Sequence, residues 1–421
     1  MPESKVLLNR LIMGRLEKVF GLMAFSASVM LTTMCVKGEE ILGVQPPPDS
    51  QTEEPEPPVK VRDTLYVTGV EYPDGYDWYQ DSEYGEVRCF IFLEKEGKKI
   101  LRVPVGYEYE TASDVDMHRC FDGHLYTDFS SDTETVVKKD GKEIFRYSGR
   151  EMIVSFYVSE GNVYTLGVSR SGDSGLSLRI NGQKEAFYET GYLISGFHEG
   201  KGGVSFAFAC ESSDSVSGCE YFFYSGGRVE KFAGEPDVLR VLDARMYEGE
   251  LYYIAEYQSI SGTEYYCFCG GKPFMLDIRG GDYVEYARLM LSESSVNVAL
   301  VCRDSSKGTR QYTVCGSNGF RYGFDGGVIP WFSMISGSSI YDVVNTSGSA
   351  FPEMVLCLDG ERKYSFGRNR SIIASESAAV VRGRLYFAFS GSVWPRRPYM
   401  SVDGKYEDGG FNGYYSSVSV W

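Results

Sequence analysis

Residues 251–276 read LYYIAEY-QSISGTE-YYCFC-GG-KPFML, and this stretch decides the fold. Three of its runs are rich in aromatic and β-branched residues and are typical of short β-strands: 251–257, 265–269 and 272–276. The Ser/Gly-rich segment 258–264 predicts a loop, and Gly270-Gly271 predicts a two-residue hairpin turn. A further strand-like segment, 283–291, leads to the next stretch of this kind. Four short strands joined by tight turns are typical of one propeller blade.

The turn pair recurs eight times, each time as two residues ending in glycine: Glu96-Gly97, Asp140-Gly141, Asn181-Gly182, Gly226-Gly227, Gly270-Gly271, Asn318-Gly319, Asp359-Gly360 and Asp403-Gly404. Successive second glycines are separated by 44, 41, 45, 44, 48, 41 and 44 residues. A period of this length is typical of repeat folds, and of propellers above all. We therefore predict an all-β fold, a β-propeller with eight four-stranded blades. Seven blades is the alternative, if one unit is an insertion.

The two ends of the repeat array predict how the ring closes. The first unit begins at its second strand, residues 64–70, and the last unit ends with an extra strand, residues 414–420. We predict that this C-terminal strand becomes the innermost strand of the first blade, because pairing the two chain ends removes exposed strand edges. The first and last blades then become neighbours.

The first 60 residues predict export and tethering rather than a folded domain. Residues 1–34 carry four basic residues and then an apolar run, as a signal peptide does. The run Leu31-Thr-Thr-Met-Cys35 resembles a bacterial lipoprotein signal, which implies lipidation at Cys35. Cleavage after Ser26-Ala27-Ser28 is the alternative and would release a soluble protein. Residues 35–60 are acidic and proline-rich and predict an extended tether. Residues 61–421 then form one propeller domain.

The chain resembles propeller-type surface lipoproteins of Bacteroidetes over residues 61–421. The resemblance rests on the repeat length and on the Asp/Asn-Gly-Lys turn, and Glu39-Glu40 behind Cys35 is similar to the surface-export signals of that group. It implies a lipid-anchored protein of the outer membrane or cell surface. A periplasmic or secreted protein is the alternative.

Composition narrows the classes of partner. The net charge of −16 is spread along the chain, which excludes the clustered basic surface that nucleic-acid binding needs. Neither metal-ligand spacing nor a cofactor motif is present, so we expect no metal and no cofactor. Cys267 and Cys269 have period-2 spacing and should point to one face of a strand. Two pairs, Cys210 with Cys219 and Cys302 with Cys315, flank hairpin loops and could join across strands. No partner is identifiable for His118 or His198.

One loop breaks the repeat and predicts a binding site. The first unit has 31 residues between Tyr66 and Gly97, against 15 to 21 in the other units. The excess, residues 71–84, combines aromatic and acidic side chains, and ring closure places it beside the loop 392–398 of the last unit. The candidate ligand-binding residues are Asp74, Tyr76, Asp77, Trp78, Tyr79, Trp394, Arg396 and Arg397. Aromatic faces with carboxylates and guanidinium groups suit sugar recognition. Alternatively, the arginines simply bridge to the acidic residues and the rings close the seam.

Three hypotheses for function remain open at this point. The first is a surface-anchored, non-catalytic binding propeller for a glycan or a partner protein, acting as a monomer. The second is a carbohydrate-active enzyme, a glycoside hydrolase or lyase, which needs two facing carboxylates in a deep pocket. The third is a structural scaffold of a surface complex. We identify no catalytic residue in the sequence.

Overall fold

The structure is a computed structural model, and it describes 64–73, 88–106, 118–131, 133–169, 175–200, 203–213, 218–233, 237–260, 262–276, 278, 283–292, 295–304, 307–317, 319–324, 328–346, 353–368, 370–372, 378–381, 384–391 and 397–420. The predicted signal peptide, Cys35 and the tether lie outside these residues. Within them, no helix has the length and apolar character that a membrane span requires.

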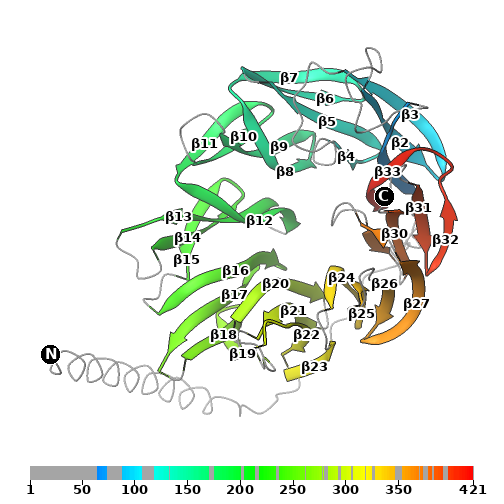
Figure 1. Ribbon diagram of the computed structural model, residues 1–421. Coiled ribbons are helices and arrows are strands. Elements are labelled where there is room, and N and C mark those ends of the chain that lie inside the picture. The colour runs from blue at the N-terminus through cyan, green and yellow to red at the C-terminus, as the bar shows by residue number, and fades with distance from the viewer. Residues whose placement is uncertain are drawn as a thin grey trace, which may run out of the picture. The chain divides into compact units, whose positions relative to one another are not determined.

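The described strands form eight antiparallel sheets, which are the blades of a propeller (Figure 1). The strands of each blade are given from the innermost outward. Blade 1 consists of β33 (Gly413–Val420), β1 (Leu65–Glu71), β2 (Cys89–Lys95) and β3 (Lys98–Val105), and blade 2 of β4 (His118–Phe121), β5 (His124–Ser130), β6 (Glu134–Lys139) and β7 (Lys142–Ser148). Blade 3 consists of β8 (Glu151–Ser159), β9 (Asn162–Ser169), β10 (Gly175–Ile180) and β11 (Gln183–Glu189), and blade 4 of β12 (Gly191–Gly200), β13 (Gly203–Glu211), β14 (Cys219–Ser225) and β15 (Arg228–Phe232).

Blade 5 consists of β16 (Val238–Tyr247), β17 (Glu250–Ser259), β18 (Gly262–Cys269) and β19 (Lys272–Met275), and blade 6 of β20 (Tyr283–Ser292), β21 (Ser295–Arg303), β22 (Arg310–Gly316) and β23 (Gly319–Phe324). Blade 7 consists of β24 (Ile329–Ser336), β25 (Ser339–Asn345), β26 (Glu353–Leu358) and β27 (Glu361–Arg368). In blade 8 two short inner strands, β28 (Arg370–Ser371) and β29 (Ala378–Val381), both pair with β30 (Arg384–Gly391), which is followed by β31 (Pro398–Val402) and β32 (Lys405–Asp408). The prediction of eight blades is confirmed, and seven is excluded.

The repeated turn pairs join the third and outermost strands of each blade. In seven of the eight turns both central residues are described, and both have positive φ, as in Asp140 (49°) and Gly141 (79°). Such turns match the twist of a hairpin, and glycine adopts positive φ without strain. An Asp, Asn or Glu at the first position also accepts a backbone N–H from the second strand; Asp359 Oδ1, for example, lies 2.9 Å from Ile340 N. This contact explains why acidic residues recur beside the glycine.

The ring closes through the C-terminal strand, as predicted. β33 pairs with β1 from Leu65 opposite Val420 to Glu71 opposite Gly413. Thr68 Oγ1 lies 2.6 Å from Ser417 Oγ within this pairing. Neighbouring innermost strands contact each other all the way round, and β33 contacts both β4 of blade 2 and β30 of blade 8. Blades 1 and 8 are therefore neighbours.

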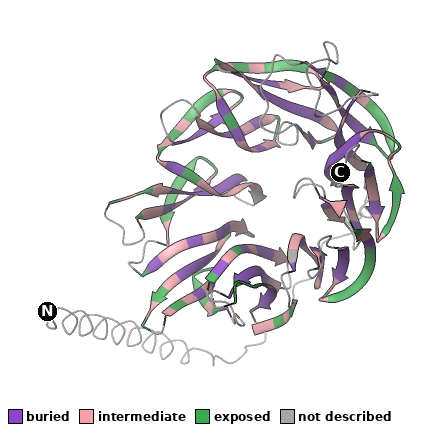
Figure 2. Cartoon of the chain, viewed as in Figure 1, coloured by how far each residue is buried: buried purple, intermediate pink, exposed green. Residues whose placement is uncertain are grey.

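Burial follows from the position of each strand in its blade. The second and third strands lie between neighbouring blades and are buried on both faces, as in β21, whereas outermost strands such as β7 are largely exposed (Figure 2). Apolar clusters fill the spaces between blades; one combines Ile254 and Cys267 of blade 5 with Leu289 and Leu300 of blade 6. These clusters hold the inner strands in fixed positions around the channel.

Several details differ from the sequence-based expectation. The loop predicted at 258–264 is mostly strand, because β17 and β18 continue pairing until Ser259 lies opposite Gly262. Neither cysteine pair is joined, and none of the nine described cysteines forms a disulfide bond. Cys210 lies opposite Glu220, so it points to the face opposite to that of Cys219. Cys302 and Cys315 share a face, but Cys315 lies opposite Val298, about 13 Å along the strand from Cys302.

Candidate functional site

A cavity of about 1100 Å³ lies in the central channel, against the innermost strands of blades 4 to 8. Its lining comes from β12, β16, β20 and β24, with Ala378 from β29 and two residues of blade 6 behind them. This volume lies at the upper end of the range of small-molecule sites, which is roughly 300–1,000 Å³. The channel is therefore large enough for a ligand of several rings.

β-Bulges shape the wall of this cavity. In blades 4 to 7 the pairing of the inner strand with the second strand shifts register, once in β20 and β24 and twice in β12 and β16. Four of the extra residues at these shifts border the cavity: Ile194, Leu242, Glu285 and Trp331. A bulge changes the direction in which side chains point, which is why bulges are frequent beside functional sites. Here Ile194, Leu242 and Trp331 border the cavity and also pack against the apolar clusters between blades.

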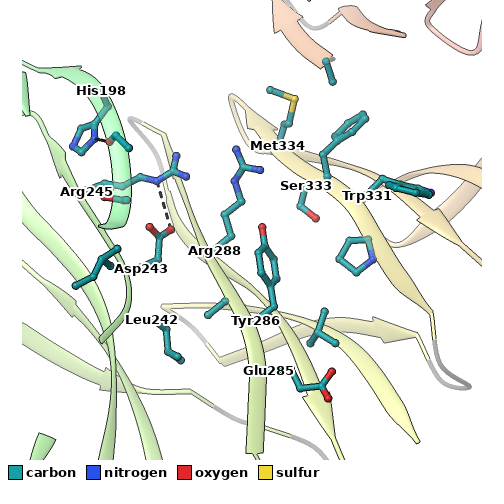
Figure 3. Close-up of a pocket in the computed structure, with 18 of the residues that line it drawn as sticks. His198, Leu242, Asp243, Arg245, Glu285, Tyr286, Arg288, Trp331, Ser333 and Met334 are labelled. Carbon is teal, nitrogen blue, oxygen red and sulfur yellow. Dashed lines mark hydrogen bonds and ion pairs between the residues drawn. The ribbon is translucent and has the colours of Figure 1, made fainter. Parts of the chain in front are cut away.

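Two arginines occupy equivalent positions in neighbouring blades. Arg245 lies opposite Tyr252 in blade 5, and Arg288 lies opposite Ala299 in blade 6, each on the innermost strand just after its bulge. Both arginines line the cavity, and in the view of Figure 3 their guanidinium groups point into it, with the Tyr286 ring below Arg288. The Tyr286 side chain is 43% exposed, so its ring is accessible to a ligand.

The two arginines differ in their partners. Arg245 Nε lies 3.5 Å from Asp243 Oδ2, whose side chain is only 8% exposed. Asp243 is held in place because it accepts the backbone N–H groups of Ala244 at 2.9 Å and of Leu289 at 2.8 Å. Arg288 has neither a hydrogen bond nor an ion pair with any residue that the structure describes. Among the described residues, the guanidinium group of Arg288 therefore has no anionic partner.

Charge in the cavity contrasts with that of the whole chain. Three arginines and two carboxylates line it, which leaves one positive charge in excess in a protein whose net charge is −16. Arg310 is neutralised because its Nε lies 2.6 Å from Glu285 Oε2. A low-dielectric wall strengthens the attraction between such a group and an anion. The cavity therefore favours an anionic ligand.

His198 connects blades 4 and 5 instead of facing a ligand. Its Nε2 accepts the backbone N–H of Met246 at 2.8 Å, and its Nδ1 lies 3.1 Å from the carbonyl oxygen of Gly196. Burial lowers the pKa of His198, and the positive charge of Arg245 lowers it further. The ring is therefore neutral with its proton on Nδ1, and both nitrogens are occupied. This partner could not be identified from the sequence, because Met246 is remote from His198 along the chain.

His118 also has a partner that the sequence did not suggest. It is buried at the start of β4, and its Nε2 contacts the hydroxyl of Ser416 on the closing strand. The contact belongs to the seam between blades 1 and 2. Within the part of the chain that the structure describes, no group of three or more His, Cys, Asp or Glu residues could hold a metal ion.

The two carboxylates of the cavity are not arranged as an acid–base pair. Asp243 accepts two backbone N–H groups, and Glu285 lies between Arg303 and Arg310 at 3.3 and 2.6 Å. The Arg310 hydrogen bond lowers the pKa of Glu285, so it stays ionised. A general acid needs a raised pKa instead. Of the residues that line the cavity, neither carboxylate is suited to protonate a leaving group.

Most of the sequence-predicted site lies outside the described residues, namely Asp74, Tyr76, Asp77, Trp78, Tyr79, Trp394 and Arg396. Arg397 is described, and its Nη1 lies 3.6 Å from Asp408 Oδ2 at an exposed position. Tyr72, at the start of the long loop, is buried, and its N–H donates to Asn412 O at 2.9 Å. The structure brings the first and last blades together, because β33 of blade 1 contacts β30 of blade 8. Arg245 and Arg288 of the channel were not among the site residues predicted from the sequence.

Comparisons with known proteins identify the fold alone. No family model matches the chain, and no curated protein matches it. A solved structure of the dihydro-heme d1 dehydrogenase NirN in complex with DHE matches with a TM-score of 0.50 and 14% identity, over 84% of this chain and 74% of that chain. A eukaryotic initiation factor matches at a TM-score of 0.37 and 10% identity, over 66% of this chain and 83% of that one, which is too weak to support an argument.

Proposed function

We propose that this protein is a non-catalytic binding propeller that takes an acidic glycan into its central channel. The observation that carries the proposal is the unpaired Arg288 guanidinium beside Arg245. A guanidinium group in a partly desolvated site is stabilised by an anion, and its planar fork matches a carboxylate in particular. A uronic-acid carboxylate supplies this anion.

The rest of the sugar fits the neighbouring surfaces. The exposed ring of Tyr286 offers an apolar face on which a sugar ring can stack, and the volume of the cavity accommodates several rings. The fixed Asp243 carboxylate keeps Arg245 oriented and limits its excess charge. Arg288 therefore binds the carboxylate directly, and Arg245 provides the second guanidinium group.

The test is isothermal titration of the full chain with oligogalacturonides, and with neutral oligosaccharides of equal length. A charge-assisted hydrogen bond contributes about 1.5–3 kcal/mol, so Arg288→Met should weaken binding by about 10- to 100-fold. Arg384→Met is the matched control, because Arg384 is an exposed arginine paired with Asp403 on the outer turn of blade 8. Equal binding of neutral and acidic oligosaccharides, or equal loss in both variants, would contradict the proposal.

The seam between blades 1 and 8 is a second candidate site for the same ligand. Closure makes these blades neighbours. Trp78 belongs to the long loop of the first unit and Trp394 to the matching loop of the last unit. Trp78→Ala and Trp394→Ala tested against the same oligosaccharides distinguish the two sites. Loss of binding in these variants, with Arg288→Met unaffected, would assign the ligand to the seam.

We also propose that the propeller is displayed at the bacterial surface as a lipid-anchored monomer. The lipobox-like sequence ending at Cys35 and the acidic tether 35–60 support this arrangement. Cys35→Ala should move the protein from the membrane fraction to the soluble fraction. Unchanged partition would exclude the anchor and favour a secreted protein. An enzyme of carbohydrate breakdown remains the competing hypothesis, and the two engaged carboxylates of the cavity count against it.

A further inference from the structure

Cys267 and Cys269 form a close thiol pair on β18, in the wall of blade 5 that faces blade 6. Their sulfur atoms lie 4.0 Å apart. Cys267 is fully buried among Ile254, Leu289 and Leu300, whereas Cys269 is only partly buried at the end of the strand, beside the Gly270-Gly271 turn. One thiol is therefore accessible to a small reagent, and the other is protected directly behind it.

The surroundings distinguish the two sulfur atoms. The contact between the two thiols lowers the pKa of Cys269, although burial and Glu250 oppose this effect. The same contact, together with burial, raises the pKa of Cys267. Lys272 lies opposite Cys269 across the hairpin. Cys269 is the accessible thiol of the pair and is therefore its nucleophile, and Cys267 lies buried beside it.

We propose that Cys267 and Cys269 form a peroxide-sensitive dithiol that closes reversibly to a disulfide. An accessible, ionisable cysteine next to a second thiol is the arrangement found in redox-sensor sites. The two cysteine pairs predicted from the sequence lack it, since Cys210 and Cys219 point to opposite faces and Cys302 lies four residues along its strand from the position opposite Cys315.

The reaction proceeds in two steps. The Cys269 thiolate attacks one oxygen of a hydroperoxide, the O–O bond breaks, hydroxide leaves, and Cys269 becomes a sulfenic acid. Cys267 then loses its proton and attacks the Cys269 sulfur, the S–O bond breaks, and the oxygen leaves as water. With hydrogen peroxide as oxidant, one peroxide is reduced to two waters while the two thiols lose two electrons.

The bond requires the backbone to move, and this strain makes it reducible. Residues two apart in a strand have Cα atoms about 6.6–6.8 Å apart, at the upper limit of the disulfide range. The sulfur atoms must approach from 4.0 Å to bonding distance, about 2.05 Å, and the adjacent glycine turn can yield to allow this. Disulfides near the geometric limit have higher reduction potentials and are readily reduced by thiols.

Peptide mapping of the full chain after hydrogen peroxide tests the proposal. The tryptic peptide from Met246 to Arg279 contains both cysteines, because Lys272 precedes a proline. After denaturation and alkylation with iodoacetamide, this peptide should be unlabelled and lighter by two hydrogen atoms. Prior treatment with dithiothreitol should restore labelling of both thiols. Full labelling after peroxide, or a wild-type peptide that carries sulfinic acid at Cys269, would overturn the proposal.

Variants separate the roles of the two thiols. In Cys267→Ser, Cys269 should accumulate as a sulfenic acid that dimedone traps, because its partner is missing. In Cys269→Ser, Cys267 should stay reduced at the same peroxide concentration. Cys302→Ser is the matched control, a buried cysteine in the same apolar cluster, and should leave the disulfide unchanged. Equal oxidation of the peptide in all three variants would refute the assignment of roles.

Discussion

Tyr414 tests whether the C-terminal strand holds the ring together. Its side chain is 3% exposed and packs with Val70 and Tyr72 in the core of blade 1, with its ring 6.3 Å from that of Tyr72. Truncation of a large buried aromatic to alanine costs about 3–5 kcal/mol. Since a folded domain is stable by only about 5–15 kcal/mol, we expect Tyr414→Ala to remove a large part of the free energy of unfolding.

Urea unfolding followed by intrinsic fluorescence measures this loss. The matched control is Tyr364→Ala on the outermost strand β27, where the side chain is 46% exposed. An exposed residue of this kind should contribute about 1 kcal/mol or less. If Tyr414→Ala loses no more stability than Tyr364→Ala, the closing strand is not part of the cooperative fold.

A second experiment isolates the strand itself. A chain that ends at Asn412 lacks β33, so the edge of β1 is left unpaired. We expect this chain to elute from a sizing column as an expanded or aggregated species, because open strand edges promote association. A synthetic peptide of residues 413–421 should restore the compact form, whereas a scrambled peptide should not. Equal recovery with both peptides would count against specific pairing.

Three further predictions concern single contacts. The pKa of His198 is lowered in the folded state, so below pH 6.5 the unfolded state binds a proton there more readily than the folded state does. The free energy of unfolding should therefore fall as pH decreases below 6.5. In urea titrations at several pH values, His198→Gln should make the free energy of unfolding less dependent on pH. Gly69→Ala should lower the free energy of unfolding by about 1–3 kcal/mol in the same assay, because a Cβ at this position would lie 2.5 Å from the Phe92 ring and from the Tyr414 carbonyl oxygen. A variant as stable as the wild type would show that β1, β2 and β33 do not pack this closely at Gly69. Asp359→Ala should cost about 1–2 kcal/mol through a lost hydrogen bond and strain at positive φ, while Asp359→Asn stays near wild type.

The blade count could be predicted from sequence because its signals are local. A turn with positive φ at both central residues requires glycine at the second, and Asp, Asn or glycine suits the first, so each hairpin leaves a trace such as Asp403-Gly404. The closing strand followed from counting strands at the two ends. The blade count depends on residues that are neighbours in sequence, and the closing strand depends on which strand edges would be left unpaired. Neither prediction requires knowledge of which residues lie opposite each other in paired strands.

The channel site could not be found in this way. Arg245 and Arg288 face the cavity only because a bulge precedes each of them, and a bulge depends on how the inner strand pairs with the second strand. The long loop at 71–84 attracted attention because it broke the repeat. A signal for the arginines was nevertheless present, since Ala244-Arg245 and Ala287-Arg288 lie one repeat apart. Aligning the inner strands by their repeat would have revealed the pair.

The position of the site follows from what the blades require. Second and third strands pack on both faces, so their side chains are fixed by the neighbouring blades. An inner strand packs on its two flanks but has a free edge toward the channel, and a bulge there adds one residue without disturbing the pairing beyond it. Met334 in blade 7, opposite Tyr341, occupies the position equivalent to Arg245 and Arg288. Charge at this position therefore varies between blades while the fold does not, and this freedom allows two adjacent arginines inside an acidic protein.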